Sequence, residues 1–283
     1  VKVVDVLESR ELVADGPLFL TIRSSWAVGR RSRITQDLTV YAHTRRIDFK
    51  TQVDWQEDRT LLKTGFAVDI HSAQIRAEIQ FGHVMRNAHE NTTWDRAKFE
   101  ACAHKWVDMS EGNYGVALLN DCKYGYDTLD GKVSLTLLRS PRCPDELADI
   151  GDHEFTYALF PHDGPFTVET VVREAWSLNV PLIAAGAAIP SGAESMLDFC
   201  RVSNPHLIVD TVKKAEDDDA IIVRLYEAGN TRGVAVVTFS SPVKKAYHCN
   251  LMEETGEALT VHGDEVELAF APFEIKTIKV YFR

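Results

Sequence analysis

Two side chains capable of proton transfer stand next to each other in the segment Gly151–Tyr157: His153 and Glu154. A histidine and a carboxylate can together act as general acid and base. The apolar residues around them predict a β-strand, in which successive side chains point to opposite faces. His153 would then share a face with Phe155 and Tyr157, while Glu154 would face the other way. The strand by itself therefore does not present the two groups as an acid/base pair.

A second polar cluster runs from Asn120 to Asp127, directly after a predicted strand. Asn and Asp at a strand end commonly bond to the backbone of the next loop, so a structured turn is the plainer interpretation of Asn120 and Asp121. Tyr124 has a further use, because an aromatic face can pack on the apolar face of a pyranose ring. Cys122 would need a lowered thiol pKa to act as a nucleophile, and the neighbouring Asp121 opposes that.

A third cluster follows another predicted strand and contains cationic and amide side chains: His83, Arg86, Asn87, His89 and Asn91. Such groups can bind a sugar hydroxyl or a carboxylate, although an ordinary strand-end loop has the same composition. His83 and His89 lie six positions apart with no well-placed carboxylate between them. That spacing favours binding over metal coordination.

The remaining candidate is His162, which closes the apolar run Phe155–Phe160 into an Asp-Gly turn. It could point into a neighbouring site or simply end the strand. The sequence has none of the common signatures of a phosphate loop, a serine-hydrolase elbow, a zinc protease or a dinucleotide fold. The polar clusters therefore carry whatever chemistry the sequence offers.

The composition excludes several classes of function. The chain of 283 residues has a net charge of −11, which argues against a surface for nucleic acid or for anionic membranes. An apolar run of about 18 residues is missing, so we expect no transmembrane helix, and the first residues lack the pattern of a signal peptide. The five cysteines have no C-x-x-C spacing. We expect reduced thiols in a cytoplasmic protein rather than disulfides or a cysteine zinc site.

Alternating and β-branched stretches predict that the first part of the chain is mostly β. The pattern predicts no long amphipathic helix there, and Thr93–Phe99 is expected to form one or two helical turns. Gln74–Met85 continues the alternation as a single strand. Further strands are predicted at Leu18–Arg23, Arg33–Val40, Ile47–Trp55, Leu61–Ile70, His104–Met109, Val116–Leu119, Val133–Leu138 and Phe155–Phe160.

The last part of the chain has a different spacing of predicted elements. Thr167–Trp176 could form either a short helix or a strand, and the segment Pro181–Ala193, rich in Pro, Gly and Ala, is interpreted as a linker. Short strands then recur regularly, which is typical of a small antiparallel sandwich. We therefore place one domain over residues 1–194 and a second over residues 195–283. The strands of the second are expected at Ser195–Val202, Leu207–Val212, Ala220–Tyr226, Gly233–Phe239, Lys244–Leu251, Leu259–His262 and twice within Val266–Arg283.

Several motifs, taken in order, resemble one known family. They are RRIDFKTQVDW, FGHVMRNAHENTTWDRAKFEACAHKWVDMSEGNYGVALLNDCKYGYD, LTLLRSP, ADIGDHEFTYALFPH, VRLYEA and AFAPFEIKTIKV. From about Arg33 to the end, the chain resembles the C-terminal half of the glycoside hydrolase family 38 α-mannosidases, and their cytosolic type in particular. The resemblance implies an all-β fold: a β supersandwich of the galactose-mutarotase type followed by a small C-terminal β-sandwich. This agrees with the strand pattern.

The resemblance also implies an activity and its location. Family 38 enzymes hydrolyse α-mannosidic bonds with retention, which needs a nucleophile and an acid/base about 5.5 Å apart. In the family, the aspartate nucleophile and the His and Asp ligands of a zinc or cobalt ion lie in an N-terminal α/β barrel and the helical region after it. No stretch of this chain matches those motifs. We therefore expect no catalytic or metal-binding residue here, and no hydrolysis of p-nitrophenyl α-mannoside by this chain alone.

In the family, the C-terminal β region packs on the barrel and contributes side chains to the edge of the active site. Golgi and lysosomal members have a pair of arginines at the end of the strand that matches VSLTLLRSP. Here a single arginine, Arg139, is followed by Ser140, which makes an identical substrate contact doubtful. The candidates for the substrate rim are Asp149, His153, Tyr157, His162, Asn120, Asp121, Tyr124, Arg86 and Arg139.

The implied partners are a mannose-containing oligosaccharide and the catalytic barrel, in the cytoplasm, without nucleic acid or membrane. An apolar docking face for the barrel could also drive formation of a homo-oligomer. Two other interpretations stay open. A stand-alone mutarotase-like domain would use His153 and Glu154, and polarimetry would detect it. A carbohydrate-binding or scaffolding module would be tested by calorimetric titration with mannose.

Overall fold

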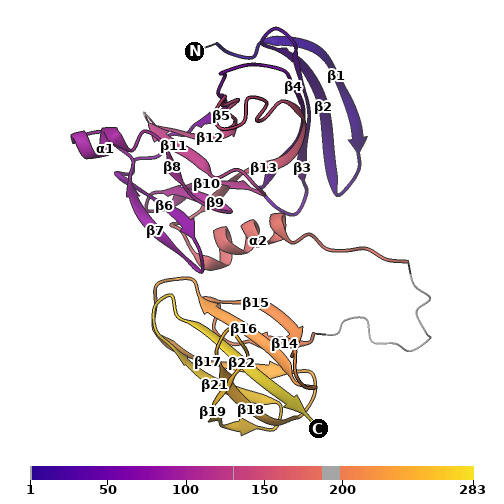
Figure 1. Ribbon diagram of the computed structural model, residues 1–283, viewed down its shortest axis with the longest axis vertical. Helices are drawn as coiled ribbons and strands as arrows, with labels where there is room; N and C mark the ends of the chain where they lie inside the picture. The colour runs from indigo at the N-terminus through magenta and orange to yellow at the C-terminus, as the bar shows by residue number, and fades with distance from the viewer. Residues whose placement is uncertain (1, 130, 187–197) are drawn as a thin grey trace. The chain divides into compact units, whose positions relative to one another are not determined.

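The computed structural model describes residues 2–129, 131–186 and 198–283, and every pair of adjacent strands whose register is known is antiparallel (Figure 1). The chain divides into two compact units. The first comprises Val1–Ile79, Val84–Phe166 and Thr170–Pro181; the second comprises Leu182–Arg283 with the short segments Gln80–His83 and Thr167–Glu169. The domain boundary predicted between residues 194 and 195 lies outside the described residues and stays a prediction.

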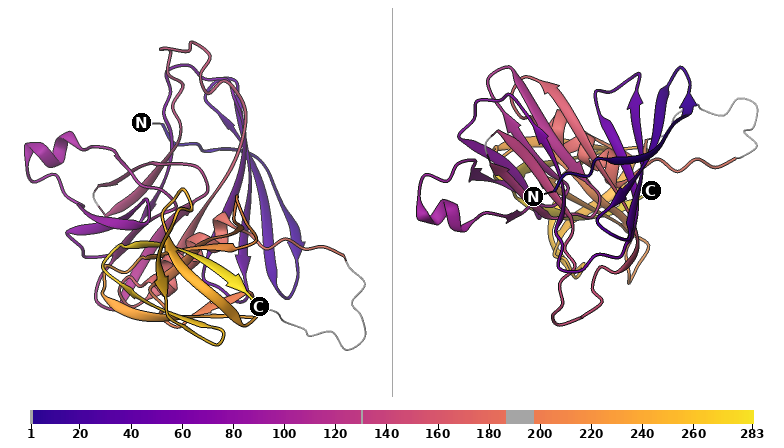
Figure 2. Two further views of the ribbon diagram at one scale, coloured as in Figure 1. Left: turned by 60° about the horizontal axis from the view of Figure 1, so that its bottom comes forward. Right: turned by 90° about the horizontal axis from the view of Figure 1, so that it is seen from above.

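The first unit holds two sheets, one large and one small. Figure 2 shows the long strands β2, β3 and β4 of the large sheet running beside one another. The large sheet has the order β1 (Val6–Asp15), β2 (Phe19–Val28), β3 (Ser32–Tyr41), β4 (Ile47–Trp55), β13 (Gly151–Asp163), β10 (Tyr114–Asn120), β9 (Trp106–Ser110), β6 (Gln74–Ile79), β7 (Gly82–Asn87). The small sheet has the order β5 (Leu62–Ala67), β12 (Lys132–Leu138), β11 (Gly125–Leu129), β8 (Ala101–Cys102).

The two sheets share one hydrophobic core, as a supersandwich requires. Alternation along β4 turns Val53 and Trp55 inward, and the same alternation along β12 turns Val133 and Leu135 inward. Phe155 of β13 joins them in the interior. Each such side chain contributes about 1.5–3 kcal/mol through burial. The packed sheets confirm the predicted all-β class.

The helices of the first unit are short. Helix α1 (Thr93–Ala97) begins after Thr92, whose hydroxyl accepts a hydrogen bond from the backbone N–H of Asp95. A π-helical turn, η1 (Val168–Val172), continues into α2 (Arg173–Asn179). The segment that the sequence left open between helix and strand is thus helical. In the part of the chain that is described, no helix has the length and apolarity needed to cross a membrane.

The second unit is a small β-sandwich, as the spacing of its strands predicted. Its core brings together Val223, Val237, Val266 and Ile278 from both sheets. One sheet has the order β14 (Cys200–Val202), β17 (Gly233–Phe239), β21 (Glu265–Phe270), β20 (Val261–His262). The other has the order β15 (Leu207–Lys214), β16 (Ile221–Glu227), β22 (Ile275–Phe282), β18 (Val243–Cys249), β19 (Thr255–Leu259).

Strands β8 and β11 were not predicted, and two further features of the first unit differ from the sequence prediction. Gln74–Met85 is not one strand but two, β6 and β7, because the chain turns at Phe81, which has a φ of +56°. Phenylalanine seldom adopts that conformation, so the sequence shows no turn signal. Strand β1 was not predicted at all. None of its ten residues is buried, and it therefore lacks the hydrophobic alternation that reveals a strand.

Candidate functional site

An open groove of about 830 Å³ lies at one end of the small sheet of the first unit. Antiparallel pairing places the start of β5, the start of β11 and the end of β12 at this same end. Two of the predicted rim residues therefore meet here, Tyr124 just before β11 and Arg139 just after β12. Tyr124 is 53% exposed, and Arg139 is also exposed. The groove also contains Arg59, which the sequence reasoning missed because it lies in a turn with no motif around it.

Asp149, a third predicted residue, holds the backbone behind Arg139. Its Oδ2 atom accepts hydrogen bonds from the N–H groups of Arg139 at 2.8 Å and Ser140 at 3.0 Å. Burial alone would raise the pKa of the Asp149 carboxyl, but these two donors and the charge of His153 outweigh burial and lower that pKa below its ordinary value. Ser140 is buried and accepts a hydrogen bond from the indole of Trp55. The loop is thus fixed while the Arg139 guanidinium stays exposed.

His153 and Glu154 have separate partners. The Nε2 atom of His153 lies 2.8 Å from the backbone oxygen of Asp149, and because a carbonyl only accepts, this nitrogen donates. Glu154 is exposed and lies 2.9 Å from the Lys50 amine. Hydrogen bonds from Lys50 and Gln52 lower the pKa of Glu154, so it remains an ionised carboxylate at neutral pH. The arrangement does not favour the mutarotase-like interpretation, in which these two residues would be acid and base.

Two further predicted rim residues lie in the interior of the large sheet. His162 is 3% exposed, and its Nε2 atom lies 2.8 Å from Oδ2 of the fully buried Asp108. The Tyr157 hydroxyl accepts a hydrogen bond from the Gln36 amide at 2.8 Å, and its ring stacks on Phe49 with centroids 5.0 Å apart. Burial raises the Tyr157 pKa, so the phenol stays neutral. The contacts of these two residues are structural.

Asn120 and Asp121 bond to the backbone, as the structured-turn interpretation expects. The buried amide of Asn120 donates to the carbonyl of His104 at 2.7 Å and accepts from the N–H of Lys123 at 2.7 Å. The Asp121 carboxylate accepts from the N–H of Thr156 at 2.8 Å. These bonds hold the loop that carries Tyr124 to the groove.

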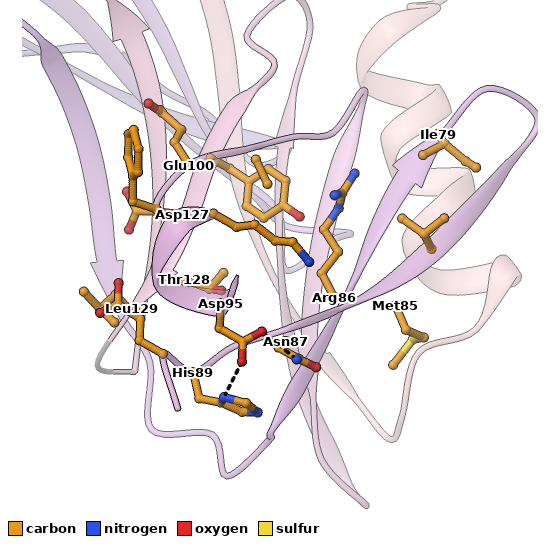
Figure 3. A pocket seen from close by; sticks show the side chains of 16 residues that line it. Ile79, Met85, Arg86, Asn87, His89, Asp95, Glu100, Asp127, Thr128 and Leu129 are labelled. Carbon is orange, nitrogen blue, oxygen red and sulfur yellow. Dashed lines mark hydrogen bonds and ion pairs between the residues drawn. The ribbon is translucent and has the colours of Figure 1, made fainter. Parts of the chain in front are cut away.

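Arg86, the ninth candidate, lines a different hollow. This cavity, of about 550 Å³, lies among β7, α1 and β11 and shares the wall Phe99–Ala101 with the groove. Figure 3 shows Arg86 and Met85 on one side of it and Glu100 and Asp127 on the other. Of the nine predicted rim residues, the structure thus places Tyr124 and Arg139 in the groove and Arg86 in this cavity, and the other six in neither.

Nucleophilic and metal chemistry find little support in the described residues. Partial burial, followed by the Asp121 carboxylate, raises the pKa of the Cys122 thiol to about 11, so the thiol stays protonated at neutral pH. Over residues 2–129, 131–186 and 198–283, no three His, Cys, Asp or Glu side chains gather as a metal site would require. A divalent metal therefore does not fit the donor set of this part of the protein.

Comparison with known proteins identifies relatives of both units. Residues 1–147 match the glycosyl hydrolases family 38 C-terminal domain, and residues 206–278 match the family 38 C-terminal beta sandwich domain. The chain is 41% identical to human alpha-mannosidase 2C1 over 263 residues and 37% identical to alpha-mannosidase G of Dictyostelium discoideum over 290 residues. These alignments cover 90% and 98% of this chain but only 25% and 26% of those relatives.

Solved structures show the same fold. An alpha-mannosidase from Enterococcus faecalis V583 matches with a TM-score of 0.78 at 19% identity, over 97% of this chain and 35% of that one. A second protein of glycosyl hydrolase family 38 from the same species matches with a TM-score of 0.76 at 18% identity, over 97% of this chain and 36% of that one. The shared architecture extends over both units.

Proposed function

The chain belongs to glycoside hydrolase family 38, and we propose that it forms the C-terminal β region of an α-mannosidase that hydrolyses α-mannosidic bonds of oligosaccharides with retention. The observation that carries the proposal is the groove, where Tyr124 and Arg139 meet at one end of the small sheet. An exposed aromatic ring can pack on a pyranose face, and an exposed guanidinium on a fixed backbone can donate to sugar oxygens. The groove thus forms one edge of a mannose-binding site.

The reacting groups of this enzyme come from outside the described β region. Retaining hydrolysis needs two carboxyl groups about 5.5 Å apart, one as nucleophile and one as acid/base. The carboxylates near the groove are engaged in other interactions: Asp149 accepts hydrogen bonds from backbone N–H groups, and Glu100 is paired with Lys63. By resemblance to the family, the catalytic barrel would hold the zinc or cobalt ion, and the described residues would not. This chain's residues bind and orient the sugar at the edge of the site.

Strand β1 supports docking of another part of the protein. It forms the edge of the large sheet, and the apolar residues Val6, Leu7, Leu12 and Val13 are 58%, 45%, 57% and 41% exposed. Its two exposed apolar pairs, separated by the polar run Glu8–Glu11, lie on an unpaired sheet edge, which commonly serves as an interaction surface. We assign the catalytic barrel as its partner. From the resemblance to the cytosolic type of the family, we also propose that the protein acts in the cytoplasm.

A chimera tests the proposal. This chain would replace the matching quarter of human alpha-mannosidase 2C1, and hydrolysis of p-nitrophenyl α-mannoside would be measured with zinc or cobalt. We expect the chimera to turn over, because the chain restores the edge of the active site. The 283-residue chain alone should not exceed the buffer rate.

Two outcomes would contradict the proposal. One is turnover by the chain alone, since catalysis would then lie in the β region. The other is a chimera that is folded by circular dichroism and monodisperse but inactive. Polarimetry of α-glucose with the chain alone is the matched test of the mutarotase alternative, and we expect the rate of buffer.

A further inference from the structure

The cavity beside α1 has two buried hydrogen-bond donors that lack a well-aligned partner. The Nε atom of Arg86 and the hydroxyl of Tyr126 are both buried and neither has a well-aligned hydrogen bond among the described residues, although the Arg86 guanidinium acts on the Tyr126 oxygen and its Nη2 donates to the carbonyl of Cys102 at 3.1 Å. Tyr126 is 2% exposed, and burial raises the pKa of its phenol to about 12, so the hydroxyl keeps its proton. Buried donors are almost always satisfied in folded proteins. Two together in one cavity indicate that an acceptor from outside belongs there.

The charges around the cavity indicate a neutral ligand. Two cationic side chains, Arg86 and Lys98, line it, against four carboxylates. An anion would therefore meet an excess of negative charge. A cation would need a free carboxylate, but Asp127 and Glu100 are ion-paired with Lys63, and Asp95 accepts from Asn87 at 2.9 Å. The fourth carboxylate, Glu90, is only partly buried, whereas the buried groups left free, Arg86 Nε and the Tyr126 hydroxyl, are donors, which a neutral oxygen satisfies.

The rest of the lining suits a sugar ring. The volume of about 550 Å³ is in the range of small-molecule sites. Apolar atoms from the side chains of Val84, Met85, Phe99 and Leu129 line it beside the polar groups. A hexose has an apolar ring face and hydroxyls that both donate and accept, so it matches this mixture of surfaces. Every lining residue belongs to the first unit, so the cavity is complete within this chain.

We propose that this cavity is a second sugar site, which binds one neutral hexose unit of a glycan through Arg86 and Tyr126, apart from the groove that holds Arg139. The site does not depend on hydrolysis by the protein. Binding would anchor a distant part of a branched oligosaccharide while another part occupies the groove. Affinity for a single hexose should be weak, and a second contact on the same glycan would raise the effective affinity.

The test is calorimetric or ligand-observed NMR titration of the 283-residue chain with methyl α-mannoside. We expect saturable binding that is about three- to tenfold weaker in Tyr126→Phe, which removes one hydroxyl and keeps the buried ring. The matched control, Tyr114→Phe, makes the same change at an exposed tyrosine outside both hollows and should leave this binding unaltered. Glucuronate should compete no better than methyl α-mannoside, because the cavity disfavours an anion.

A second variant keeps the test valid if Tyr126→Phe does not fold. Met85→Trp places bulk at the exposed edge of the cavity, away from the buried donors, and should abolish binding without lowering the melting temperature. The proposal is overturned if the chain shows no saturable hexose binding, if Tyr126→Phe and Met85→Trp bind as the wild type does, or if Tyr114→Phe weakens binding as much as Tyr126→Phe.

Discussion

The groove and the interior of the large sheet hold predicted rim residues in opposite situations. In the groove, Arg139 and Tyr124 have backbones fixed by hydrogen bonds and side chains that are exposed. In the large sheet, His162 and Tyr157 are at most 4% exposed and have protein partners for the polar atoms described above. Of the residues predicted for one rim, those in the sheet interior are thus held by protein contacts, while those in the groove stay exposed and accessible to a ligand. Substitutions of the buried residues and of the exposed groove residues should therefore have different effects on stability and activity.

The largest expected effect is on the interior. His162→Ala would leave the fully buried Asp108 carboxylate without its histidine partner, which costs about 3–5 kcal/mol of unfolding free energy. Urea unfolding monitored by tryptophan fluorescence measures it, and the signal is specific because Trp26, Trp55, Trp94, Trp106 and Trp176 all belong to the first unit.

His162→Gln is the matched control for this prediction. Its amide can donate to Asp108 from nearly the same place as Nε2, so it should recover part of the lost stability. An alanine variant as stable as the wild type, with lowered activity in the chimera, would contradict the structural role of His162 and support its contact with the substrate.

The sequence could predict which strands these residues occupy but not whether their side chains meet a ligand. Alternation along β13 correctly placed His153, Phe155 and Tyr157 on one face. The partner of His162, however, is Asp108, 54 positions away in the chain. Only the pairing of β9, β10 and β13 brings the two together, and no local pattern encodes that order.

The second prediction concerns the groove, where a substitution should affect activity and not stability. In the chimera, Arg139→Ala should lower kcat/KM for p-nitrophenyl α-mannoside by about 10- to 100-fold, because a fixed donor near the sugar is lost. Its unfolding free energy should stay within about 0.5 kcal/mol of the wild type, since the side chain is exposed. Arg139→Lys should fall between the two, as the ammonium keeps the charge but not the fork of donors. If Arg139→Ala had the kinetic constants of the wild type, the groove would not be part of the active site.

The third prediction concerns Asp149, a predicted rim residue whose carboxylate holds the backbone of the groove residue Arg139. Asp149→Asn should lower unfolding free energy by about 1–2 kcal/mol at neutral pH, because an ionised acceptor of two backbone N–H groups is replaced by a neutral one. The folded-state pKa of this carboxyl is lowered, so its stabilising effect is present above about pH 4 and is lost as pH falls through the lower folded-state pKa. Melting temperatures of wild type and variant should therefore converge below about pH 4. A gap that stays constant to pH 2.5 would show that the carboxylate charge does not hold the loop.

The two units also differ in how well their strands could be predicted. In the second unit, β17 was predicted at its exact bounds and β15, β16 and β18 to within two residues, because short strands around a closed core alternate clearly. The prediction missed β19, which has no buried residue, and its strand Leu259–His262 spans the end of β19 and β20. In the first unit, β1 has no buried residue and β7 follows a turn at Phe81, so neither gives the expected signal. For the cavity beside α1, the sequence indicated one of the two proposed binding residues. Arg86 belonged to a polar cluster, but Tyr126 is a core residue whose hydroxyl reaches the cavity from another strand.

The smallest expected effect is on Tyr124. Tyr124→Ala in the chimera should raise KM for a mannose-terminated oligosaccharide about two- to fivefold with little change in kcat, because ring stacking adds roughly equal stabilisation to ground and transition states. The ring is 53% exposed and packs on His104 with centroids 5.5 Å apart, so stability should change little. Tyr124→Trp keeps an aromatic face and should retain the wild-type KM. If both variants match the wild type, Arg139 reaches the sugar without an aromatic partner; if Tyr124→Ala lowers kcat instead, the ring orients the bond that is cleaved.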